Sequence, residues 1–227
     1  MKTIIPAAAS LTALMFIAAC ATAPEIAGDP VAVGPDFPPT LVELNFESHG
    51  DRLNGHAYLA EGEGPHPTVV LLHGFPGNER NLDLAQDLRR DGFNVLFFHY
   101  RGAWGSEGAY SFTHIIEDVA SATDMLRANT ETYRTDPDKL ILIGHSMGGF
   151  AALEAAANDE RIACVAAIAP ANLGAIANAF DADPASAEGF SAYSDTLQML
   201  AGLTGDTAVA EIMASRDAFD VVALAPK

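Results

Sequence analysis

The sequence predicts an α/β fold, with a mostly parallel β-sheet, helices on both of its faces and an N-terminal antiparallel hairpin. Short continuous apolar runs, such as 68–72, are typical of strands buried on both faces. These runs alternate along the chain with stretches whose apolar residues recur at helical spacing. The chain has 227 residues, 49% of them hydrophobic, which favours one domain with one sizeable core.

The first two strands are expected to form the hairpin. Val42, Leu44 and Phe46 alternate with polar residues, and a second run extends over 53–60 after a turn expected at Gly50-Asp51. Alternation of this kind indicates strands with one face in the core and one in water.

Beyond residue 68 the signals of strand and helix alternate. The predicted strands are 68–72, 93–98, 140–143 and 162–168, and the predicted helices are 81–91, 115–126 and 147–157. Strands connected by helices form a parallel sheet, so six strands in all are expected. The segment 172–215 is alanine-rich and acidic and has no strand signal, which favours short helices over the site.

The first 19 residues are typical of a signal peptide, because one charged side chain, Lys2, precedes a mostly apolar stretch. Ile17-Ala18-Ala19-Cys20 resembles a bacterial lipobox, in which the cysteine carries the lipid; the alternative is an ordinary cleaved signal with an incidental cysteine. Residues 20–40 contain five prolines and are expected to link Cys20 to a domain over 41–227. The prediction is therefore a lipid-anchored protein of the bacterial cell envelope, on the outer membrane or the periplasmic side.

Composition excludes several other classes of partner. A formal net charge of −18 would repel the chain from nucleic acid. Neither a phosphate-binding Gly-x-x-x-x-Gly-Lys motif nor a zinc-binding His-Glu-x-x-His motif occurs, so neither a cofactor nor a metal is expected. Two cysteines, Cys20 and Cys164, make a disulfide framework improbable on composition alone.

The strongest chemical signal is Gly144-His145-Ser146-Met147-Gly148, placed where a buried strand turns into an alanine-rich helix. A nucleophile at the tip of such a turn needs small residues two positions before and after it, because strand and helix pack closely there. The helix that follows directs its free amides and its positive dipole end toward the serine oxygen. Ser146 is the predicted nucleophile.

A second motif, His73-Gly74-Phe75-Pro76-Gly77, ends the first buried strand, and a third, Tyr100-Arg101-Gly102-Ala103-Trp104-Gly105-Ser106, follows the next. Together with the serine motif they resemble the α/β-hydrolase superfamily over about 68–170, where the third loop has the pattern Arg-Gly-x-Gly-x-Ser. The resemblance implies an oxyanion hole formed by the amides of Phe75 and Met147. Arg101 and Trp104 either line the pocket or are structural, with the structural role favoured for the arginine, and His99 is expected to be a hydrogen-bonded core residue.

The resemblance fails for the rest of the catalytic triad. In this family an acid and then a histidine follow the serine, but all seven histidines of this chain lie at or before His145. Asp206, Asp217 and Asp220 follow no apolar run of adequate length. The expectation is that the C-terminal strands are missing, that the acid and histidine lie beyond Lys227, and that the chain as given is nearly inactive.

The resemblance implies a serine hydrolase that acts on a small-molecule or peptide substrate, cleaving an ester, thioester or peptide bond through an acyl-enzyme at Ser146. A non-catalytic lipoprotein that keeps the pocket for binding is the alternative. A haloperoxidase or transferase that uses the same serine is also compatible with these motifs.

Overall fold

The computed structural model describes residues 36–224, which form a six-stranded sheet with the order β1-β2-β4-β3-β5-β6. The predicted signal peptide, the lipobox-like Cys20 and most of the proline-rich segment lie outside the described residues. Within 36–224, none of the helices is both long and apolar enough to cross a membrane.

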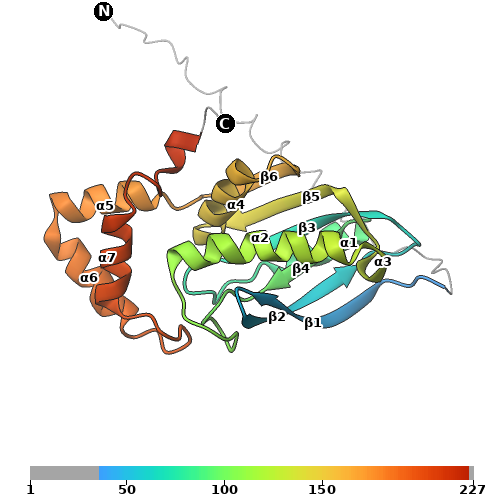
Figure 1. Cartoon of the computed structure of the whole chain (residues 1–227), viewed down its shortest axis with the longest axis horizontal. Helices are drawn as coiled ribbons and strands as arrows, with labels where there is room; N and C mark the ends of the chain where they lie inside the picture. Colours follow the sequence, from blue (N-terminus) through green and yellow to red (C-terminus); the bar gives the residue numbers. More distant parts are fainter. Residues whose placement is uncertain (1–35, 225–227) are drawn as a thin grey trace, which may run out of the picture.

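Figure 1 shows the elements in order along the chain. The strands are β1 (Thr40–Ser48), β2 (Asp51–Leu59), β3 (His66–Leu72), β4 (Asn94–Phe98), β5 (Thr135–His145) and β6 (Ile162–Ile168). The helices are α1 (Leu82–Arg90), α2 (Phe112–Ala128), α3 (Thr130–Tyr133), α4 (Met147–Asn158), α5 (Leu173–Ala182), α6 (Pro184–Ser194), α7 (Gly205–Ala214) and the 3₁₀ helix η1 (Val221–Leu224).

The N-terminal hairpin is confirmed, but its turn lies one residue earlier than expected. Ser48 pairs with Asp51, so the two turn residues are His49 and Gly50 rather than Gly50 and Asp51. Their φ angles are 52° and 91°. Two positive φ angles in a two-residue loop are the geometry whose twist matches an antiparallel pair, and glycine at the second position accommodates it.

The four strands from β3 to β6 are parallel where they pair, and helices cover both faces of the sheet. Val70 and Leu72 of β3 point into the main core, against α2 and α4, whereas Val69 and Leu71 point to the opposite face, against α1. Alternate residues of one strand therefore face different helices, which explains the uninterrupted apolar runs in the sequence.

A buried ion pair joins the loop after β4 to helix α2. The Arg101 guanidinium donates to Asp118 from Nε at 2.6 Å and also bonds Glu117, and its backbone N–H donates to Asp118 at 2.7 Å. Ser48 Oγ donates to the same carboxylate at 2.6 Å. The favoured structural role of Arg101 is confirmed, since its donors are directed into the protein.

Helices α5, α6 and α7 form a cap, the segment 172–215 in which short helices were expected, and lie together at one end of the sheet (Figure 1). Main-chain bonds fasten this cap to the loop after β4: Trp104 N donates to Met199 O at 2.9 Å, and Tyr110 N donates to Ala201 O at 2.9 Å. The Glu211 carboxylate accepts from the first amides of α2. The cap is thus joined to loops at the carboxyl ends of the strands.

The last strand, β6, pairs only with β5 among the described residues. Its side chains are unusually exposed for a strand of a parallel sheet, and Ile168 is 48% exposed. The predicted six strands are confirmed.

Candidate active site

Ser146 occupies the tip of the turn between β5 and α4, as the strand-turn-helix context predicts. Its backbone has φ 55° and ψ −116°, which a non-glycine residue seldom adopts. The turn is fixed by three bonds: Ser146 N donates to Ile168 O at 3.0 Å, and Ser146 O accepts from Phe150 N and Ala171 N. The side chain is half-buried, so a substrate can reach its hydroxyl.

Two glycines allow this turn to pack. A Cβ on Gly144 would lie 2.1 Å from Gly148 O, and a Cβ on Gly148 would lie 2.2 Å from Leu72 O. Both obstacles are backbone atoms of regular elements, which cannot rotate away as a side chain would. Glycine is therefore required at both positions.

The two amides expected to form an oxyanion hole belong to segments next to the serine. Met147 is the first residue of α4, and the first helical bond runs from Phe150 N to Ser146 O, which leaves the Met147 amide without a partner in its helix. The backbone of Gly74 adjoins the serine, because a Cβ there would be 3.3 Å from Ser146 Cβ. The Phe75 amide follows directly and donates no hydrogen bond to any described residue.

His73 is buried and both of its ring nitrogens are engaged. Nδ1 lies 2.8 Å from Gly74 O, and Nε2 lies 3.3 Å from Nδ1 of His99. Since a carbonyl only accepts, His73 Nδ1 carries the proton and Nε2 accepts from His99. Burial lowers the pKa of His73 to about 4 and that of His99 to about 3, so both rings are neutral near pH 7.

The third histidine near the turn, His145, is directed elsewhere: its Nδ1 lies 3.7 Å from a Glu79 carboxylate oxygen. Over residues 36–224, none of the imidazoles hydrogen bonds Ser146 Oγ. His99 forms the expected hydrogen bond, to His73, and stacks on Trp104, but it is half-buried and not a residue of the core. Two of the aspartates considered as triad acids accept hydrogen bonds elsewhere: Asp220 from Asn172 Nδ2 at 2.7 Å and Asp206 from Ser191 Oγ at 3.3 Å.

An aromatic group from the cap meets the loop after β3. The Phe75 ring stacks on Phe190 with 5.9 Å between centroids, and Tyr193 lies edge-on at 6.3 Å. The sequence did not predict a role for Phe190 or Tyr193, because an aromatic residue in an alanine-rich helix does not reveal which distant residue it contacts. The uncharged rings make the surroundings of Phe75 apolar.

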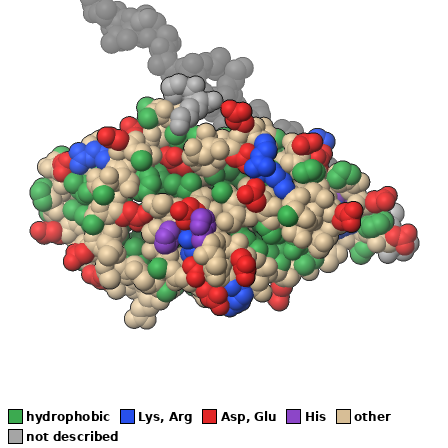
Figure 2. All heavy atoms as spheres, viewed as in Figure 1, with side chains coloured by type: hydrophobic (Ala, Val, Ile, Leu, Met, Phe, Trp, Pro, Cys, Tyr) green, Lys and Arg blue, Asp and Glu red, His purple; other side chains and the backbone are tan. Residues whose placement is uncertain are grey.

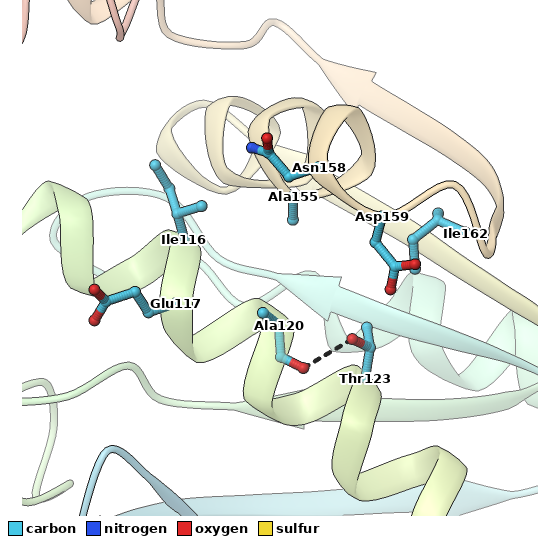
Figure 3. A pocket seen from close by; sticks show the side chains of 8 residues that line it. All are labelled: Ile116, Glu117, Ala120, Thr123, Ala155, Asn158, Asp159 and Ile162. Carbon is cyan, nitrogen blue, oxygen red and sulfur yellow. Dashed lines mark hydrogen bonds between the residues drawn. The ribbon is translucent and has the colours of Figure 1, made fainter. Parts of the chain in front are cut away.

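One hollow of the described residues lies away from Ser146. It has a volume of about 210 Å³ and lies between α2 and the far end of α4, where Ile116, Ala120, Ala155 and Ile162 form its apolar part (Figure 3). Asp159 at its rim is paired with Arg127 and Arg161. Within 36–224, no group of three or more His, Cys, Asp or Glu side chains is arranged to hold a metal ion.

The surface is predominantly acidic, as the net charge requires. Figure 2 shows carboxylate groups scattered over one face among apolar and other atoms, with fewer lysine and arginine side chains.

Comparison with known proteins agrees with this architecture. A family model described as the alpha/beta hydrolase fold matches residues 67–211. The chain is 31% identical over 134 residues to the uncharacterized protein YfhR of Escherichia coli K12, covering 56% of this chain and 45% of YfhR. It is 28% identical over 151 residues to the esterase EstD of Thermotoga maritima, covering 60% of this chain and 35% of EstD.

A solved structure supports the fold alone. The hydrolase GrgF of a Penicillium species superposes with a TM-score of 0.54 at 23% identity, over 68% of this chain and 55% of GrgF. The chain spans less than half the length of the two curated relatives above.

The packing of the serine turn predicts a sharp difference between two glycine-to-alanine changes. Gly148→Ala should lower the free energy of unfolding by more than about 3 kcal/mol or prevent folding, because its methyl group meets the Leu72 carbonyl. Gly189→Ala, inside α6 with nothing within 4 Å, should stabilise by up to about 1 kcal/mol. Urea unfolding measures both, and equal effects would contradict the close packing.

The burial of His73 predicts a specific dependence of stability on pH. Its folded pKa of about 4 lies below the ordinary 6.5, so the unfolded chain takes up the proton first as the pH falls. The contribution of His73 to the free energy of unfolding is therefore complete above about pH 6.5. It decreases by about 3 kcal/mol as the pH falls toward 4. His73→Gln should flatten this decline in urea unfolding, whereas His49→Gln, at an exposed imidazole, should leave it unchanged. Identical pH profiles for wild type and His73→Gln would refute the assignment.

Proposed function

Since the chain belongs to the α/β-hydrolase family, we propose that it is a serine hydrolase whose nucleophile is Ser146. The observation that carries the proposal is the conformation of Ser146, held at positive φ on a half-buried turn between β5 and α4, with the loop after β3 beside it. A serine in this position has no structural need for its hydroxyl, which forms no hydrogen bond with a described residue. The arrangement is suited to nucleophilic attack.

In the proposed reaction, Ser146 Oγ bonds to the carbonyl carbon of the substrate as its proton passes to a general base. The carbonyl oxygen takes up negative charge, which the amides of Phe75 and Met147 stabilise by donating hydrogen bonds. The alcohol, thiol or amine then leaves with a proton, and water hydrolyses the acyl-serine. His73 is a poor candidate for the base, because its basic nitrogen already accepts from His99.

An ester is the substrate we favour over a thioester or a peptide. The name of the relative EstD supports this choice. The apolar surroundings of Phe75, to which Phe190 and Tyr193 contribute, suit an uncharged acyl group. The acidic surface disfavours anionic substrates by like-charge repulsion.

A pocket-bearing protein without catalytic activity is the second candidate. It is favoured by one observation, namely that none of the described imidazoles hydrogen bonds Ser146 Oγ. The two candidates differ in the reactivity of the serine.

In the whole protein, Ser146 should therefore react covalently with a fluorophosphonate probe, and Ser146→Ala should abolish the labelling. Ser186→Ala, at an exposed serine of α6, is the matched control and should label like the wild type. Mass spectrometry of the labelled peptide identifies the site. Labelling that persists in Ser146→Ala contradicts the proposal, and a wild type that does not react favours the non-catalytic candidate.

The second part of the proposal concerns location: Cys20 carries lipid and tethers the protein to the bacterial cell envelope. It is supported by the sequence Ile17-Ala18-Ala19-Cys20 after an apolar stretch. Cys20→Ser should move the protein from the membrane fraction to the soluble fraction of fractionated cells, and Cys164→Ser should not. Membrane association that survives Cys20→Ser would exclude the lipid anchor.

A further inference from the structure

We propose that Trp104 is a positioning residue for the oxyanion hole, acting through a hydrogen bond from its indole to the loop that carries the Phe75 amide. This inference rests on the proposed function of Ser146 and Phe75. It assigns to Trp104 a role in charge stabilisation rather than in lining the pocket.

The first observation is the backbone of Trp104. Its φ is 49°, in the left-handed region that large side chains seldom adopt. In the Arg-Gly-x-Gly-x-Ser pattern that begins at Arg101, position 104 is the second glycine. A tryptophan thus occupies a conformation suited to glycine, and this strain indicates that the side chain provides something that glycine does not.

The second observation is the bond that the indole forms. Trp104 Nε1 donates to Pro76 O at 2.8 Å, and Pro76 is the residue after Phe75. Gly77 lies against the same ring, since a Cβ on it would be 2.7 Å from the indole nitrogen. The loop from Gly74 to Gly77 is therefore held at Pro76 and Gly77 by one directed bond and one close contact.

The third observation is that the indole itself is held in place. His99 stacks on it with centroids 6.1 Å apart, and the Arg80 guanidinium lies 5.4 Å over the ring. At its backbone, Trp104 N donates to Met199 O of the cap at 2.9 Å. Because the ring and the backbone of Trp104 are both held, its indole N–H can determine where the Pro76 carbonyl lies. A mobile side chain would instead move with the loop.

These contacts have a consequence for the reaction. The Phe75 amide stabilises the oxyanion only if its N–H points at the oxygen with hydrogen-bond geometry, and a displacement of about 1 Å is costly. The loop has a glycine on either side of the Phe75-Pro76 pair, so an external bond is an effective way to fix it. The Trp104 indole provides this bond.

The test compares the covalent labelling of Ser146 in three proteins by a fluorophosphonate, in which the Oγ–P bond forms as fluoride leaves and the phosphoryl oxygen occupies the oxyanion hole. Trp104→Phe keeps an aromatic ring but loses the donor, and Trp104→Gly restores the residue of the motif and also loses the donor. Both should show a kinact that is roughly 10- to 100-fold lower than wild type, with the concentration for half-maximal rate nearly unchanged. A role limited to packing would not produce this split, because Trp104→Phe preserves much of the packing.

Ser186→Ala, at an exposed serine of α6, is the control and should label within about twofold of wild type. If wild type labels and either Trp104 variant labels equally fast, the inference is overturned while the proposed function stands. If wild type does not label, the proposed function fails first.

One measurement needs no substitution. Trp104 is the only tryptophan, so the ¹⁵N-labelled protein gives a single indole resonance. Its N–H should exchange with solvent at least roughly tenfold more slowly than that of free indole, as a held donor does. Exchange at the rate of free indole would overturn the inference even if the variants did not fold.

Discussion

The close contact of three backbone segments, at Leu72, Gly144 and Gly148, is the constraint on which the rest of the site depends. Because no side chain fits between them, β5 must turn sharply into α4, and Ser146 must take the single position at the tip. The same contact joins the end of β3 to the start of α4, so the loop after β3 passes beside the serine. The proposed nucleophile and the loop that carries a proposed amide donor are therefore adjacent as a result of packing.

Burial gives the histidines of this region a structural role rather than a chemical one. A solvated imidazole near pH 7 exchanges protons readily, but desolvation holds His73 and His99 neutral over a wide pH range. Their mutual hydrogen bond and the Gly74 carbonyl use the positions that a base would need. Two ring contacts connect His73, His99 and Trp104 into one cluster, and the Trp104 indole donates to the loop after β3.

Much of the fold and the turn at Ser146 was predictable from the sequence, because the contacts that determine them are local. Apolar runs indicated the buried strands, and the spacing of small residues around Ser146 indicated the turn. Strand starts were missed because His66 and Thr135 are polar, and the hairpin turn was placed one residue late because alternation alone does not fix which two residues adopt positive φ. Contacts between distant segments, such as Phe75 with Phe190, left no local pattern and required the structure.

The cap and the oxyanion loop are connected through the loop after β4, and this connection determines how a change in one reaches the other. Exposed ion pairs such as Arg161 with Asp124 contribute little, because water and salt screen them. Main-chain hydrogen bonds between half-buried segments, such as the bond from Trp104 N to Met199 O, are directional. Breaking one of them lowers the stability more than breaking an exposed ion pair does. A displacement of the cap at Met199 would therefore move Trp104, and through its indole would move Pro76 and the neighbouring Phe75 amide. In this arrangement two hydrogen bonds of Trp104 connect the cap to the loop that carries the proposed Phe75 donor. Under the proposed function, selectivity and rate are therefore expected to change together when the cap changes.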